Sequence, residues 1–316
     1  MKTITFLLIG TLAGGAAFAD PFQKENVSAD AKWLVHLDVE NLLTTQLGGF
    51  LGREFLDKQI AKPASDLSQQ FGIDLDWRQI QSVTVYGTDF RKAADAQGVL
   101  LIKSKFNVAE SLDTVIAKLA GQLGEGNTPL RKLTDTPFAL YTANNEVFGA
   151  AVRPGFFLLS KSREQIEKAQ RVIAGKSPNL SAAKSFAALP DTKGFLVVSV
   201  ADAFNQGLKL PGPAQGLKNA EGGQAVAGEK GDRVFVNLAV QTKDTESATQ
   251  MQQVLQGLLA MAALSQNENP DLQKLVQGLK VGGHDKVVSV NLEVPTADVI
   301  ARVTETKGET KKKKRG

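Results

Sequence analysis

Residues 31–43 read AKWLVHLDVENLL, and residues 192–204 read TKGFLVVSVADAF. The two segments align without gaps. In each, apolar residues at alternate positions predict a β-strand that leads into a helix start, at Asn41 or Asp202. Because the same strand–helix unit occurs twice at a distance, the sequence indicates an internal repeat. We therefore predict that the chain contains two related halves.

The segments that follow this unit also correspond in the two halves. A strand at 99–105 is followed by apolar residues at helical spacing, and a strand at 234–240 is followed by a similar helix from about Asp244. Residues 83–86 and 224–227 precede these strands as antiparallel hairpin partners. This order predicts the α+β class, in which each half is a mainly antiparallel sheet with helices packed on one face.

The predicted organisation has four parts: a signal peptide at 1–19, a first α+β half at 20–175, a second α+β half at 176–306, and a disordered basic tail at 307–316. The boundary between the halves follows a cluster of glycine, serine and proline near 175–192. Within the second half, residues 211–231 contain six glycines and two prolines. This composition predicts the most mobile internal segment of the chain.

The N-terminus has the features of a secretory signal. Lys2 supplies a positive charge, residues 4–17 are uncharged and mostly apolar, and Ala17-Phe18-Ala19 provides a small-residue cleavage site. We therefore expect cleavage near Ala19 and a periplasmic or extracellular location. The remaining chain has no apolar run of the length that a membrane span requires, so we expect no transmembrane segment.

The overall charge describes the C-terminus rather than the body of the protein. The whole chain carries a formal net charge of +4, but residues 20–306 contain 30 basic and 32 acidic residues. The basic side chains of the tail include Lys311, Lys312, Lys313, Lys314 and Arg315. A run of like charges is usually a solvated terminus, although it can also give a weak contact with an anionic surface. Both interpretations remain open.

Few residues in the sequence are suited to catalysis. The chain has no cysteine, which excludes thiol catalysis and cysteine-ligated metal sites, and its only histidines are His36 and His284. His36 and Asp38 lie two residues apart on one face of a predicted strand, where they could share a proton or bind a metal. The same spacing is typical of the solvent side of a half-buried strand. His36 and Asp38 are therefore weak candidates, and we predict no catalytic motif, metal site or cofactor.

Four stretches, WLVHLDVENLL, IQSVTVYG, GVLLIKSKFNVAESL and KVVSVNLEVPTADVI, carry a resemblance to uncharacterised exported proteins of planctomycete-type bacteria. The resemblance covers most of the chain after the signal peptide and implies no activity or site residue.

The leading hypothesis is an exported, non-enzymatic binding or structural protein of the periplasm or cell envelope. Its partner would be an unidentified macromolecule or envelope component. The alternative is a hydrolase or metal-dependent enzyme that uses dispersed carboxylates near His36 and Asp38.

Overall fold

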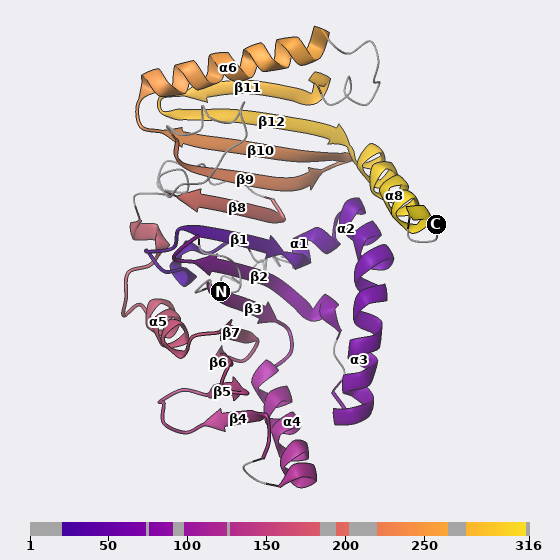
Figure 1. Ribbon diagram of the computed structural model, residues 1–316, viewed down its shortest axis with the longest axis vertical. Helices are drawn as coiled ribbons and strands as arrows, with labels where there is room; N and C mark the ends of the chain where they lie inside the picture. Colours follow the sequence, from indigo (N-terminus) through magenta and orange to yellow (C-terminus); the bar gives the residue numbers. More distant parts are fainter. Residues whose placement is uncertain are drawn as a thin grey trace, which may run out of the picture.

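The computed structural model describes residues 21–73, 76–90, 98–124, 127–183, 194–201, 220–264 and 276–313. Its centre is one twelve-stranded antiparallel sheet in the order β11-β12-β10-β9-β8-β1-β2-β3-β7-β6-β5-β4 (Figure 1). The strands are β1 (Trp33–Asp38), β2 (Ile80–Gly87), β3 (Gly98–Ser104), β4 (Leu130–Leu133), β5 (Leu140–Ala143), β6 (Val147–Arg153), β7 (Phe156–Ser160), β8 (Leu196–Ala201), β9 (Ala220–Lys230), β10 (Arg233–Thr242), β11 (Leu279–His284) and β12 (Val287–Pro295).

The helices connect the strands or follow them. They are α1 (Val39–Leu43), α2 (Gln46–Leu51), α3 (Asp57–Phe71), α4 (Val108–Leu123), α5 (Arg163–Ile173), α6 (Thr245–Leu264) and α8 (Thr296–Lys313). A π-helical turn (Gly52–Leu56) joins α2 to α3, and short 3-10 helices span Lys24–Asn26, Trp77–Gln79 and Leu180–Ala182. The α+β class predicted from the sequence is confirmed. The predicted hairpins are confirmed too, since β2 pairs with β3 and β9 with β10, all antiparallel.

The sheet runs without a break across the predicted boundary between the halves. Strand β1 pairs with β8, so that Val35 lies opposite Val198 and Leu37 opposite Leu196. Farther along, the Glu229 carboxylate of β9 accepts hydrogen bonds from the backbone N–H groups of Gln46 and Leu47 at 3.0 Å each, at the start of α2. The sequence left open whether the two halves share one sheet, and backbone pairing of β1 with β8 joins all the strands into one.

One face of the sheet, which we call the α5 face, carries the largest hydrophobic cluster. Leu34, Leu101 and Leu158 point to this face from β1, β3 and β7, and they pack with Ile166 and Ala169 of α5. The N-terminal segment lies on the same side, since Leu180 N–H donates to the Val27 carbonyl at 2.8 Å and both residues belong to this cluster. The α5 face is consequently the more tightly covered one.

The opposite face, which we call the groove face, holds the other helices that pack on the sheet. Leu42 of α1, Leu47 of α2 and Ile300 of α8 pack around Leu37, while Ala248 and Met251 of α6 pack on Val288 of β12. Helix α4 lies on the same face, because the Tyr141 hydroxyl donates to Asp113 at 3.0 Å. The prediction that helices cover one face is thus wrong for α5, whose apolar stripe needs a second apolar sheet surface to bury it.

The glycine-rich stretch at 211–231 is only partly described. Residues 220–230 form β9, an eleven-residue strand, whereas 211–219 lie outside the described residues. A glycine in this strand has a packing role, because a Cβ atom at Gly228 would lie 2.3 Å from the Phe235 ring on the neighbouring strand. The prediction of mobility is therefore wrong for 220–230.

The two chain ends extend beyond what the structure describes. The predicted signal peptide, 1–19, lies within residues 1–20, which are outside the described residues, so it stays a prediction. The backbone of α8 is helical through Lys313, while residues 314–316 and the side chains from 306 onward lie outside the description, so the predicted disorder of the tail also stays a prediction. Among the described residues, no helix combines the length and the apolar character that a membrane span requires.

A buried tyrosine is expected to make this fold less stable at alkaline pH. Tyr86 is 2% exposed on the α5 face. Burial raises the pKa of its hydroxyl well above the ordinary value, and the nearby charge of Asp30 raises this pKa further. In the unfolded chain the tyrosine ionises near pH 10, so above this pH the unfolded state loses the proton that the folded state retains, and the free energy of unfolding falls.

We expect Tyr86→Phe to remove this loss, which amounts to about 1.4 kcal/mol at pH 11. Urea denaturation of both proteins at pH 8 and pH 11 gives the fall in the free energy of unfolding between the two pH values. Comparing this fall in the wild type and in Tyr86→Phe isolates the contribution of the tyrosine. An equal decline in the wild type and in Tyr86→Phe would contradict the assignment.

Candidate functional site

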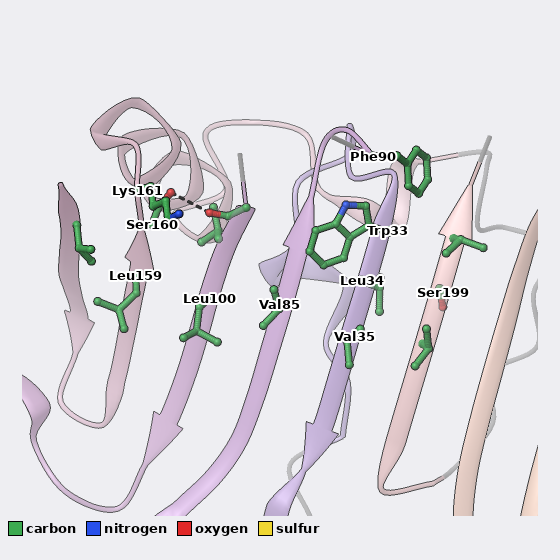
Figure 2. A pocket seen from close by; sticks show the side chains of 15 residues that line it. Trp33, Leu34, Val35, Val85, Phe90, Leu100, Leu159, Ser160, Lys161 and Ser199 are labelled. Carbon is green, nitrogen blue, oxygen red and sulfur yellow. Dashed lines mark hydrogen bonds between the residues drawn. The ribbon is translucent and has the colours of Figure 1, made fainter. Parts of the chain in front are cut away.

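An open apolar groove of about 660 Å³ lies on the groove face of the sheet, across the strands at its centre. Figure 2 shows these strands side by side, with the apolar side chains of β1, β2, β3, β7 and β8 along them. The lining side chains that point to this face are mainly apolar: Trp33, Val35, Val85, Phe90, Leu100, Val147, Leu159, Val198 and Val200. A volume of this size falls within the range of small-molecule binding sites.

Trp33 lies flat on the sheet at one end of the groove. Its register partner on β2 is Gly87, which in turn pairs with Gly98 of β3. A Cβ atom at Gly87 would lie 2.5 Å from the indole, so the ring occupies the space that a side chain would otherwise fill. The indole N–H donates to the Asp89 carbonyl at 2.7 Å, which fixes the ring orientation and leaves its apolar surface facing the groove.

The side chains of Ser160 and Ser199, on two of the strands that form the groove, point to the α5 face, where they are already hydrogen-bonded. The Ser160 hydroxyl donates to the Gly98 carbonyl at 2.8 Å and accepts from the backbone N–H of Ser162 at 3.1 Å, while Ser199 accepts from Gln224 at 3.3 Å. Lys161 lies at the same end as Ser160 (Figure 2). The groove therefore offers mainly carbon surface to a ligand, and apolar contact is the interaction that it can supply.

The floor of the groove is accessible to solvent. Val35, in the middle of β1, is 36% exposed although it belongs to a central strand of a twelve-stranded sheet. Helix α6 packs on β10, β11 and β12, and α4 contacts β4, β6 and β7, so these two helices lie on either side of the central strands. An exposed apolar surface at the centre of a sheet is unusual, since such surfaces are normally buried by a neighbouring layer.

His36 and Asp38 lie on the α5 face, opposite the groove. His36 is 2% exposed, its Nδ1 is 2.8 Å from the Thr84 hydroxyl, and its ring centroid is 5.5 Å from that of Phe22. Asp38 is 1% exposed, and its carboxylate accepts from the Asn41 N–H at 2.8 Å as the N-cap of α1. The interpretation of this pair as the solvent side of a half-buried strand is wrong, because both side chains are buried and Phe22 of the N-terminal segment packs next to the His36 ring.

The surroundings of His36 leave little space for a ligand. A cavity of about 10 Å³ lies next to it, which is room for about one water molecule. In the part of the chain that the structure describes, no three His, Cys, Asp or Glu side chains come together as a metal-binding group. His284 is far from this place in the fold, on an exposed hairpin end where its Nε2 is 3.1 Å from an Asp285 oxygen. The described geometry thus gives the metal-enzyme alternative no support.

Sequence reasoning missed the groove residues. An interpretation that puts His36 and Asp38 on the solvent side of a half-buried strand implies that Trp33 and Val35, on its other side, face a core. The available signal was the pairing of glycines: Gly87 ends one hairpin strand and Gly98 begins the next, which leaves space for a large ring from an adjacent strand. That signal identifies the place of an aromatic side chain but not an open surface.

No protein-family model matches the chain, and no curated protein matches it significantly. Among solved structures, the fold is similar to TP0453, a Treponema pallidum lipoprotein. Its crystal form IV superimposes with a TM-score of 0.47 at 11% identity, over 91% of this chain and 97% of that one. Its crystal form III gives a TM-score of 0.47 at 10% identity, over 92% of this chain and 100% of that one. At such values the likeness transfers no residue role.

Proposed function

We propose that this protein is an exported, non-enzymatic binding protein that takes an apolar ligand, such as an acyl chain, into the groove. The observation that carries the proposal is the continuous apolar floor, to which β1, β2, β3, β7 and β8 all contribute. Removing apolar surface from water is worth roughly 25 cal/mol per Å², so a ligand that covers this floor gains affinity without specific polar contacts.

Export is part of this proposal and rests on the sequence. The charged start, the apolar stretch and the small-residue site of 1–19 support it, as does the resemblance to uncharacterised exported proteins. An exported protein without cysteine depends on its hydrophobic core for stability, and the clusters on both faces of the sheet are consistent with that requirement.

We also infer that the groove lies where two related halves meet. The sequence alignment makes His36 equivalent to Val197, and these two residues are direct register partners in the β1–β8 pair. Outward from that pair, the strand orders β1-β2-β3-β7 and β8-β9-β10-β12 correspond, with α4 and α6 following the third strand and α5 and α8 following the fourth. These correspondences support a duplication in which the paired first strands supply the middle of the binding floor.

The test introduces polarity into the floor. Val35 and Val198 are register partners, and both line the groove. Replacing both by threonine keeps their shape and strand propensity but adds two hydroxyl groups that an apolar ligand cannot satisfy. We expect Val35→Thr/Val198→Thr to weaken binding of a fluorescent fatty acid by at least about tenfold, because each unpaired hydroxyl costs on the order of 1–3 kcal/mol.

Leu238→Thr is the matched control. Leu238 is 41% exposed on the groove face but does not line the groove, so its replacement should leave the affinity unchanged. Competition with unlabelled palmitate measures both variants against the wild type, and far-UV circular dichroism verifies their fold. No saturable binding by the wild type, or equal affinity in the double variant and the control, would refute the proposed function.

A further inference from the structure

The exposed apolar side chains of this protein gather on one side of the sheet. Within the described ranges, every large apolar side chain that is strongly exposed belongs to the groove face or to a helix packed on it. These residues are Val35, Leu123, Val147, Leu238, Val254, Leu258, Met261 and Leu264. A typical monomer scatters such residues over its surface, so their concentration on one side indicates a contact surface.

Helix α6 contributes half of these side chains. Its Ala248 and Met251 are buried against the sheet, whereas Val254, Leu258 and Met261 are 55%, 42% and 68% exposed. The spacing of four and three residues places these three in one stripe along the helix. The helix carries no charged residue from Ser247 to Leu264, so no charge interrupts this apolar surface. A helix of this kind can lie on a lipid surface with its apolar stripe in the acyl boundary.

The C-terminal helix begins on the same side. Val299 and Ile300 of α8 pack with Leu37 on the groove face. The chain that continues from α8 contains six Lys or Arg and one Glu in residues 307–316, while residues 20–306 are slightly acidic. A cluster of basic residues next to a membrane-contacting element is attracted to anionic headgroups, at roughly 1 kcal/mol per charge near the surface.

We propose that this side of the molecule docks onto an anionic lipid surface, with Val254, Leu258 and Met261 entering the acyl boundary and the basic C-terminus contacting the headgroups. Binding of a helix to a membrane surface combines buried apolar area with electrostatic attraction to anionic lipids, and this chain has both an exposed apolar stripe and a basic run. A protein partner would match the apolar stripe but would leave the basic run unexplained.

The experiment measures co-sedimentation of the chain from Asp20 onward with vesicles of phosphatidylcholine, with and without phosphatidylglycerol. The wild type should bind the anionic vesicles in a salt-dependent way. Val254→Gln/Leu258→Gln/Met261→Gln should weaken that binding by at least about tenfold at every salt concentration. Ala260→Gln is the matched control, since it places the same residue on an exposed part of α6 away from the stripe. It should bind like the wild type.

A second variant separates the electrostatic contribution. Replacing residues 311–315 by glutamine keeps the chain length and removes the positive charges. This variant should still bind vesicles through the apolar stripe, but its binding should depend much less on salt concentration. Failure of the wild type to sediment with anionic vesicles overturns the inference, and so does equal binding by the triple variant and the control. Concentration-dependent dimers without vesicle binding would overturn it in favour of a protein interface. Because none of the substituted residues lines the groove, the vesicle experiment tests docking independently of ligand binding in the groove.

Discussion

Leu158→Ala is expected to lower the free energy of unfolding by about 2–5 kcal/mol. Leu158 is 0% exposed in the middle of β7, where it pairs with Leu101 of β3 and Ala150 of β6 and packs in the same cluster as Ile166 of α5. Truncation removes buried methyl groups and leaves a cavity, because strands on both sides prevent the site from collapsing. Urea denaturation followed by circular dichroism measures the loss.

The neighbouring residue provides the control, because successive side chains of a strand point to opposite faces. Leu159 lies on the groove face, where it is only partly buried and lines the groove. We expect Leu159→Ala to cost less stability than Leu158→Ala but to weaken binding of the fatty acid, whereas Leu158→Ala should retain the wild-type affinity in the fraction that is folded. If the two variants had the same stability and the same affinity, the assignment of the two faces would be wrong.

The sequence predicted the local elements of this fold well. Alternation and turn residues identified the hairpins β2–β3 and β9–β10, because both strands of a hairpin and its turn are close together in the chain. The cap of α5 is equally local, since the Ser162 hydroxyl accepts from the Gln165 N–H at 3.4 Å. A local sequence pattern could not predict the pairing of β1 with β8, because these strands are far apart in the chain.

The burial of His36 and Asp38 was not predictable from their residue types. Polar residues in a strand normally face water, since burial without a partner is costly. Here Thr84 and the start of α1 provide partners within 2.8 Å, and these partners come from the fold rather than from the spacing of the pair. The open groove was missed for a related reason, because a row of valines looks the same in the sequence whether a helix or a ligand covers it.

The most direct test of the binding proposal uses Trp33 as the reporter. The protein has two tryptophans: Trp33 lines the groove, whereas Trp77 is 8% exposed and donates to Asp57 at 3.0 Å away from it. Trp77→Phe therefore leaves only the groove tryptophan, and Trp33→Phe leaves only the distant one. Titration of both variants with a brominated fatty acid, whose bromine atoms quench indole emission on close approach, compares the two positions.

We predict saturable quenching of most of the emission in Trp77→Phe, with little change in Trp33→Phe. Unlabelled palmitate should reverse this quenching, because it competes for the same apolar floor. Equal quenching in the two variants would contradict the proposal that the groove binds an apolar ligand. So would the absence of quenching in Trp77→Phe at concentrations at which the fatty acid stays dissolved.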